Sequence, residues 1–254
     1  MILTIDIGNT TLHFGIFAEG RLRSQWRMAT RSLSTPGRLR RALRALPKTK
    51  RLALSRSSQI ICCSVVPHMS RVLTQALRSF GGPAIRLIGR DVRVPLKNRY
   101  RHPRQVGQDR LVGAYAAWRT YHRDCIVADF GTALTIDVVT RRGDYLGGII
   151  APGPGISLEA LADKTALLPK VALRRPPELI GRDTANSIRS GVLYGSAALC
   201  DGLIGQLKRR YVPRATVVAT GGTSRLIAPH TRLVDHVRPH LVLEGLSRLA
   251  HLEK

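Results

Sequence analysis

Two short segments of the chain place aspartate, glycine and small polar residues in the same order at the end of an apolar run. The first runs from Asp6 to Thr10 and reads DIGNT; the second runs from Asp129 to Ala133 and reads DFGTA, 123 positions later (129 minus 6). Glycine lets the backbone approach a ligand, asparagine and threonine donate hydrogen bonds to phosphate oxygens, and aspartate can hold a hydrated cation. One such turn is weak evidence, because turns favour these residues anyway. Two copies predict a clamp that holds a polyphosphate from both sides.

A third glycine segment follows much later in the chain. Gly221 and Gly222 lie in the sequence ATGGT, directly after the β-rich residues 216–219 and before an expected helix. Such a turn can support a nucleoside, although a plain strand-to-helix loop uses the same residues. Together with the two aspartate segments, it indicates ATP as the polyphosphate.

The elements that must position these segments repeat as well. Each aspartate segment is predicted to be the turn of a β-hairpin, with second strands at residues 12–17 and 134–139 and third strands at residues 22–28 and 145–150. Hydrophobic periodicity and capping residues predict the remaining elements. Helices are expected at about residues 35–46, 67–80, 108–121, 156–167, 184–210 and 239–251, and strands at residues 60–66, 84–88 and 215–219.

This order of elements predicts an α/β protein built from two duplicated halves. We expect residues 1–115 and residues 116–254 to form the halves, each with three antiparallel strands followed by alternating helices and strands. The ATP cleft is expected between them. The chain has 254 residues, of which 44% are hydrophobic, so it can bury a core of this size.

The charge of the chain is strongly basic. Lys and Arg number 41 against 16 Asp and Glu, a formal charge of +25, and no acidic residue lies between Glu19 and Asp91. Such a balance is compatible with nucleic acid, an anionic membrane or small anionic substrates, and also with a solvated arginine-rich surface, which we favour. Single-strand binders stack bases on aromatic side chains, yet Trp26 is the only aromatic residue between Phe17 and Phe80. We therefore do not expect a dedicated nucleic-acid partner.

The cysteines and the amino terminus bear on the cellular compartment. The chain has four cysteines, Cys62, Cys63, Cys125 and Cys200, and none of them is in C-x-x-C spacing. Reduced, buried thiols fit this pattern better than structural zinc or a redox pair. The first residues lack the basic start of a signal peptide, and no apolar run approaches the ~20 residues that span a bilayer. We expect a cytoplasmic protein without a membrane partner.

The motifs taken together resemble those of the type III pantothenate kinase family, also described as the Bvg accessory factor family, within the actin, sugar kinase and Hsp70 superfamily. The resemblance extends from Met1 to about Leu246. Its segments are Asp6 to Thr10, Tyr100 with Pro103, Gly107 to Arg110, Asp129 to Ala133, Gly147 and Gly148 with Pro152 and Gly153, Gly181 to Thr184, and Gly221 with Gly222.

The resemblance implies transfer of the γ-phosphoryl group of ATP to the primary hydroxyl of pantothenate, which gives 4'-phosphopantothenate and begins coenzyme A synthesis. Such a transfer needs a group that orients and deprotonates the attacking hydroxyl. The family match assigns this catalytic role to Asp109, although spacing alone leaves a surface Asp–Arg pair at a helix start equally open. Two alternatives remain: a kinase of the superfamily with another small hydroxylated substrate, and a non-enzymatic regulator that binds nucleic acid through residues 20–90.

The resemblance also implies roles in nucleotide and cation binding. Asp6 is expected to position Mg²⁺ through water, and Asp129 to bind a monovalent cation, K⁺ or NH₄⁺. The residues implied to contact ATP are Asp6, Ile7, Gly8, Asn9, Thr10, Thr11, Leu12, His13, Thr132, Gly221 and Gly222.

Pantothenate contacts are implied for a further set of residues: Tyr100, Gly107, Gln108, Asp109, Arg110 and Thr184. The family is dimeric, so a homodimer is expected, with Thr184 reaching the site of the partner subunit. Packing of Tyr100 and capping of the long helix by Thr184 are the structural alternatives.

Overall fold

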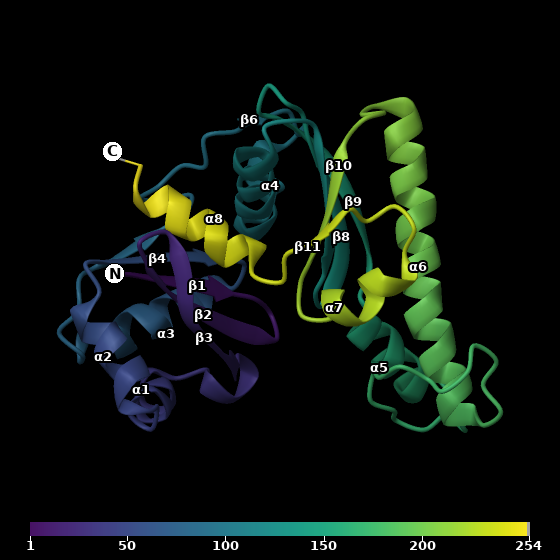
Figure 1. Ribbon diagram of the computed structural model, residues 1–254. Helices are drawn as coiled ribbons and strands as arrows, with labels where there is room; N and C mark the ends of the chain where they lie inside the picture. Colours follow the sequence, from purple (N-terminus) through teal and green to yellow (C-terminus); the bar gives the residue numbers. More distant parts are fainter. Residues whose placement is uncertain (253–254) are drawn as a thin grey trace. The chain divides into compact units, whose positions relative to one another are not determined.

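The computed structural model describes residues 1–252, and the chain divides into two compact units (Figure 1). The first unit comprises Met1–Pro95, Arg104–Ala116 and residues 242–252, and the second comprises Leu96–Pro103 and Ala117–Leu241. The division predicted from the sequence places the last helix with the second half, whereas its contacts group Val242 and the following residues with the first unit. Each unit contains its own sheet.

The sheet of the first unit has five strands in the order β3-β2-β1-β4-β5. Strands β1 (Ile2–Ile7), β2 (Thr11–Ala18) and β3 (Arg21–Ala29) form an antiparallel meander, and β4 (Gln59–Ser64) and β5 (Ile85–Leu87) run parallel to β1. The central strand β1 is almost wholly buried, whereas the edge strand β3 alternates exposed and less exposed side chains, as a half-covered strand should.

One face of this sheet is covered by three helices, α1 (Pro36–Arg44), α2 (Lys48–Arg56) and α3 (Pro67–Arg78). Thr35 caps α1, since its hydroxyl accepts the N–H of Arg38 at 3.4 Å. A short 3₁₀ turn, Arg31–Leu33, precedes α1. Helix α2 was not predicted, because its run of lysine and arginine residues has only a weak apolar face.

The opposite face of the first sheet is covered by α8 (Leu241–Ala250) and the first half of α4 (Gln108–Tyr121). A Cβ atom added at Gly15 of β2 would lie 3.0 Å from the side chain of Leu243 in α8. Gly245 allows α8 to pack closely against α4, because a Cβ atom added at Gly245 would lie 2.7 Å from Val112. The strand residues on this face include Thr4 and Asp6.

The sheet of the second unit has six strands in the order β11-β10-β7-β8-β9-β6. Strands β7 (Cys125–Phe130), β8 (Ala133–Val139) and β9 (Asp144–Pro152) form the antiparallel meander, and β10 (Thr216–Thr220) runs parallel to β7. The short strands β6 (Lys97–Asn98) and β11 (His236–Val237) complete its edges.

The helices of the second unit are dominated by α6 (Thr184–Arg210), which packs along one face of its sheet (Figure 1). Helix α5 (Pro154–Lys164) contacts α6, and α7 (Ser224–Ile227) follows β10 after a turn of three residues, 221–223. Two short 3₁₀ turns, Pro103–Gln105 and Ala228–His230, precede α4 and follow α7. Among residues 1–252, no helix combines the length and apolar character that crossing a membrane requires.

The predicted duplication is visible in the strand orders. The first sheet reads β3-β2-β1-β4-β5, and the second contains the equivalent series β9-β8-β7-β10-β11, with β6 added at one edge. The two hairpin turns differ by one residue: residues 8–11 separate the paired residues Ile7 and Leu12, and residues 131–133 separate Phe130 and Leu134. The α/β class with duplicated halves is thus confirmed.

Candidate active site

The turn between β1 and β2 presents a short polar loop. It is closed by the N–H of Gly8, which donates to the carbonyl of Thr11 at 2.9 Å, and Asn9 and Thr10 are exposed. The side chains of Ile7 and Leu12, which flank the loop, are fully buried in the core of the first unit. Of these two residues, only main-chain atoms can face a nucleotide.

Asp6 lies at the end of β1 beside a cysteine of the neighbouring strand. The register pairs Asp6 with Cys63 of β4, and the thiol donates to Oδ1 of Asp6 at 3.1 Å. Burial of the Cys63 thiol raises its pKa, and the nearby Asp6 raises it further, so the sulfur keeps the proton that it donates. Sequence reasoning treated Cys63 only as a buried thiol, because the contact depends on the register between strands 57 positions apart.

The carboxyl group of Asp6 has an altered acidity. Its partial burial raises the pKa from 3.8 to about 7, and the negative charge of Asp109 contributes in the same direction. The hydrogen bond from Cys63 and the positive charge of Arg27 act in the opposite direction. The two carboxylates of Asp6 and Asp109, far apart in sequence, are therefore close enough in the first unit to repel one another.

Asp109 lies in the first turn of α4, where its Oδ1 accepts the N–H of Arg110 at 2.8 Å. Asp109 is half-buried, so Asp109 and Arg110 do not form a fully solvated Asp–Arg pair. Gly107 leaves room for this carboxylate, since a Cβ there would lie 2.5 Å from Oδ1 of Asp109 and 3.4 Å from Val65. The glycine of the predicted Gly107–Arg110 motif thus serves the placement of the aspartate.

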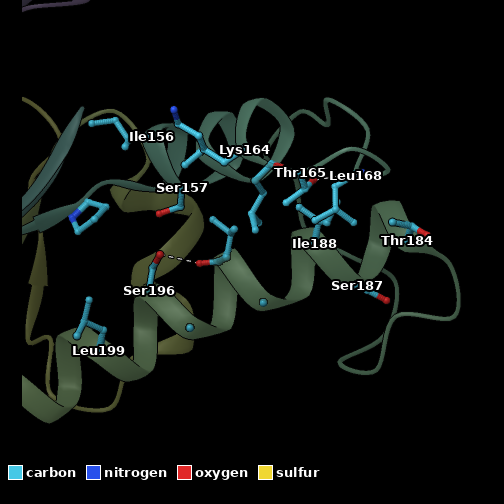
Figure 2. A pocket seen from close by; sticks show the side chains of 16 residues that line it. Ile156, Ser157, Lys164, Thr165, Leu168, Thr184, Ser187, Ile188, Ser196 and Leu199 are labelled. Carbon is cyan, nitrogen blue, oxygen red and sulfur yellow. Dashed lines mark hydrogen bonds between the residues drawn. The ribbon is translucent and has the colours of Figure 1, made fainter.

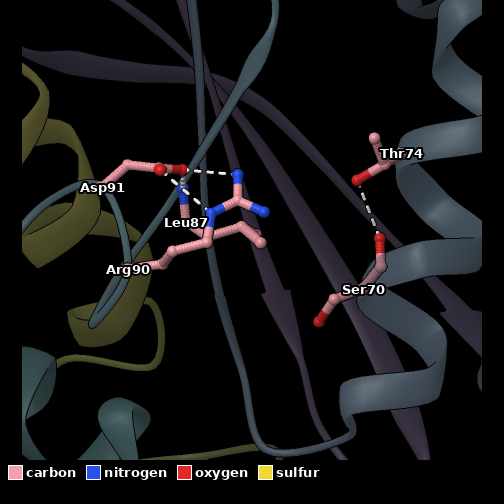
Figure 3. A network of polar contacts seen from close by, with 5 residues as sticks. All are labelled: Ser70, Thr74, Leu87, Arg90 and Asp91. Atoms are coloured by element: carbon pink, nitrogen blue, oxygen red, sulfur yellow. Dashed lines mark hydrogen bonds and ion pairs between the residues drawn. The ribbon is translucent and has the colours of Figure 1, made fainter.

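The start of α4 also contacts the turn that follows β5. Gly89 of this turn has a φ of +85°, and a Cβ there would lie 3.0–3.2 Å from the side-chain amide of Gln108. Figure 3 shows how the turn is held: Asp91 accepts the N–H of Leu87 at 2.8 Å and forms an ion pair with Arg90 at 2.7 Å. A turn of fixed shape therefore supports the residue next to Asp109.

His13 lies on β2, directly beside Asp6 of β1. It is paired with Asp6 in the register and is buried, with Nε2 at 3.0 Å from Oε1 of Gln25. Its side chain projects from the same face of the sheet as that of Asp6, because directly paired residues share a face.

In the second unit, Asp129 and the Gly221-Gly222 turn come together. A Cβ at Gly221 would overlap Oδ1 of Asp129 and would lie 2.7 Å from the carbonyl oxygen of Phe130. Thr223 anchors the turn, because its hydroxyl donates to the same carbonyl at 2.9 Å. Asp129 and Gly221, 92 positions apart (221 minus 129), are thus brought into contact, and Thr132 lies in the adjoining hairpin turn.

This contact leads to a stability prediction for Gly221. Its φ of +93° disfavours any side chain, and the Asp129 carboxylate occupies the place of a Cβ. We expect Gly221→Ala to lower the free energy of unfolding by about 2–4 kcal/mol, measured by urea denaturation. Gly202→Ala is the matched control, because Gly202 lies inside α6 with open space around it, and alanine there should raise the stability by up to about 1 kcal/mol. Equal effects of the two substitutions would contradict the prediction.

Tyr100 and Thr184 lie apart from one another in the second unit. The ring of Tyr100 lies against Gly147, where an added Cβ would approach the ring to 3.1 Å. The backbone N–H of Tyr100 donates to Oδ1 of Asn98 at 3.0 Å. Thr184 is exposed at the first turn of α6. Its alternative role as a helix cap is wrong, since Asp183 is the capping residue and accepts the N–H of Asn186 at 2.8 Å.

Comparison with known proteins places the chain among its relatives. Residues 2–206 match the family model described as type III pantothenate kinase. A type III pantothenate kinase of Moorella thermoacetica is 40% identical over 246 residues, which cover 97% of this chain and 97% of the relative. One of Geotalea uraniireducens is 37% identical over 249 residues, with 98% and 97% covered.

The chain belongs to the type III pantothenate kinase family. The family predicted from the motifs is confirmed. The solved structure of MreB 5 of Spiroplasma citri bound to AMPPNP is similar in fold, with a TM-score of 0.52, 10% identity and 97% and 95% of the two chains covered. At this identity the likeness concerns the fold, and it supports the actin-like class.

The residues of this type III pantothenate kinase fit a divalent cation that arrives with its nucleotide. Within residues 1–252, no group of three or more His, Cys, Asp or Glu side chains is arranged to hold a metal ion. Mg²⁺ characteristically keeps several waters and binds one or two carboxylates together with substrate phosphates. Asp6 suits this mode. Burial and the negative charge of Asp109 raise the pKa of its carboxyl group, and a cation would reduce the repulsion between the two carboxylates.

Proposed function

We propose that the protein transfers the γ-phosphoryl group of ATP to the primary hydroxyl of pantothenate. Membership of the type III pantothenate kinase family supports this reaction. The observation that carries the assignment of residues is the proximity of Asp6 and Asp109, which is expressed in the raised pKa of Asp6. This proximity places the carboxylate of Asp6, next to the proposed phosphate loop, near the half-buried carboxylate of Asp109 at the start of α4.

Asp109 is proposed as the catalytic residue. The hydroxyl oxygen of pantothenate attacks the γ-phosphorus, the bond from that phosphorus to the bridging oxygen of ADP breaks, and the hydroxyl proton passes to Asp109. The N–H of Arg110 already occupies Oδ1, which holds the carboxylate in one orientation. Gly107, Gln108 and Arg110 would surround the substrate, with the guanidinium offering donors to its carboxylate.

The loop from Gly8 to Thr11 is proposed to receive the phosphates of ATP. Its exposed Asn9 and Thr10 offer amide and hydroxyl donors, and Asp6 holds the water shell of Mg²⁺, which neutralises phosphate charge when bound. His13, on the same face of the sheet as Asp6, would also contact ATP.

The second unit is proposed to supply a monovalent cation site and nucleotide contacts. Oδ1 of Asp129 lies against Gly221, and a carboxylate oxygen suits K⁺ as well as NH₄⁺. Thr132, Gly221 and Gly222 would face the nucleotide, and Tyr100 would contact pantothenate.

A coupled assay for ADP release tests the proposed reaction. With ATP, Mg²⁺ and K⁺, we expect ADP to form only when pantothenate is added, together with a phosphorylated product found by mass spectrometry. A panel of other small hydroxylated acceptors serves as the comparison. Absence of pantothenate-dependent ADP, or faster turnover of another acceptor, would contradict the proposal.

We also infer a homodimer formed through α5 and α6. These helices flank a hollow of about 820 Å³ whose surface is mostly apolar. Figure 2 shows the side chains that line it. Gly191 and Gly195 of α6 have open space where side chains would lie, and Ile156 and Leu199 are apolar yet exposed by 39% and 42%. Because contiguous apolar surface marks protein interfaces, a second copy of the chain is the expected occupant. Thr184 and Lys164 also line this hollow.

Charge introduced into the hollow tests the dimer. We expect Leu199→Asp to convert a dimeric protein into monomers in light scattering, because an aspartate buried at the interface would lack a partner. Leu252→Asp is the control, since Leu252 is a similarly exposed leucine (37%) outside this surface, and its variant should remain dimeric. A monomeric wild-type protein, or a dimeric Leu199→Asp variant, would exclude this interface.

A further inference from the structure

Thr30, the residue that follows β3, contacts the loop between β1 and β2 twice. Its hydroxyl donates to the carbonyl oxygen of Gly8 at 2.9 Å, and its backbone N–H donates to the carbonyl oxygen of Thr10 at 2.9 Å. Thr30 is itself buried, with 4% of its surface exposed. A buried side chain therefore holds an otherwise exposed loop from the interior of the unit.

These two bonds determine which loop atoms can face an anion. Carbonyl oxygens would repel phosphate, and those of Gly8 and Thr10 are turned toward Thr30. A trans peptide group is planar, with its C=O and N–H pointing in opposite directions. Fixing the carbonyl of Gly8 toward the interior therefore aims the N–H of Asn9 away from Thr30.

The duplicated hairpin of the second unit is supported from the equivalent position. Position 153 corresponds to position 30 by the same offset of 123 (153 minus 30), and it likewise follows the third strand of its meander, β9. Residue 153 is glycine, and a Cβ there would overlap the carbonyl oxygens of Gly131 and Thr132. In both units the residue after the third strand thus abuts the carbonyl side of the turn, through a hydroxyl in one and through bare backbone in the other.

We propose that Thr30 is a positioning residue for nucleotide binding: its hydroxyl orients the peptide group between Gly8 and Asn9 so that the N–H of Asn9 receives a phosphate oxygen. This proposal rests on the proposed function of that loop as the ATP phosphate site. Thr30 does not touch the reacting atoms and acts only through the backbone of the loop.

A graded series of substitutions at Thr30 tests the role of the hydroxyl. Valine has the same shape without a donor, serine keeps the hydroxyl, and cysteine offers a weak donor of similar size. We expect Thr30→Val to raise the KM for MgATP about tenfold, because a buried carbonyl loses its partner, while the KM for pantothenate stays unchanged. Thr30→Ser should restore the wild-type KM, and Thr30→Cys should lie between serine and valine.

Thr4 offers a matched control in the same sheet. It is also buried, and its hydroxyl also donates to a glycine carbonyl, that of Gly15, at 3.1 Å. Thr4→Val should lower the melting temperature, as Thr30→Val does, but leave the KM for MgATP unchanged. An equal rise in KM from both variants, or no rise from Thr30→Val, would overturn the positioning role.

Direct titration with MgATP separates this proposal from the one on which it rests. If Asp6→Asn binds MgATP as tightly as the wild type, the loop is not the phosphate site and both proposals fail. If Asp6→Asn loses binding while Thr30→Val keeps it, only the role of Thr30 is wrong. Should Thr30→Val not fold, the comparison of Thr30→Ser with Thr30→Cys decides: equal KM values for MgATP would refute the proposal.

Discussion

Replacing Asp109 with asparagine is expected to lower kcat by about 10²- to 10⁴-fold, the range that a general base contributes. Asparagine keeps the oxygen that accepts the N–H of Arg110 at 2.8 Å, so the start of α4 should remain intact. What is lost is the group that takes the proton of the attacking hydroxyl. Steady-state kinetics with both substrates would show a large fall in kcat with little change in the KM for MgATP.

Asp124→Asn provides the control for this experiment. Asp124 also accepts a backbone N–H, that of Arg141, at 2.8 Å, but lies in none of the predicted motifs. Its substitution should leave kcat unchanged. A kcat for Asp109→Asn within a factor of about three of the wild type would exclude Asp109 as the base, since each tenfold change corresponds to about 1.4 kcal/mol of barrier.

The second large effect is expected at Asp6, where function and stability should change in opposite directions. The folded-state pKa of about 7 exceeds the usual 3.8, so the folded protein binds this proton more tightly than the unfolded chain. The penalty for ionising Asp6 is absent below about pH 4, grows as the pH rises toward 7, and is complete above it. Asp6→Asn removes the penalty and should stabilise the protein on the order of a few kcal/mol at pH 8.

The same substitution removes the carboxylate that faces the phosphates. We therefore expect kcat/KM for MgATP to fall by about 100-fold or more, because charge stabilisation of this kind is worth several kcal/mol. Melting curves of the wild type and Asp6→Asn between pH 4 and 8, recorded with chelator and without nucleotide, would test the stability effect. A difference in melting temperature that stays constant across this range would contradict the assigned pKa.

The sequence predicted the elements that carry strong local signals. Thr35 before Pro36 marks the start of α1, and the long apolar pattern after Asp183 marks α6. The duplicated aspartate turns predicted the order of three strands in each half, because the same local sequence forms the same hairpin twice. For the same reason the segments from Asp6 to Thr10 and from Gly107 to Arg110 could be recognised as candidate site residues.

Contacts that depend on the alignment of distant strands could not be predicted in this way. Cys63 meets Asp6 only because β1 and β4 pair in one register, and a shift by one residue would turn the thiol to the other face. The support of the Gly8 carbonyl by Thr30 likewise depends on where β3 ends. Helix α2 lacked an apolar stripe, so its stability comes from packing that periodicity does not reveal.

Most of helix α8 packs in the first unit, although the second unit precedes it in the chain. The ribosome makes β2 before the second unit, yet the face of the sheet that contains Gly15 meets Leu243 only after residues 117–241 have been synthesised. Domains generally fold as they emerge, the amino-terminal one first. Here one face of the first sheet must stay uncovered until the second unit has been translated, so the first unit is completed after the second.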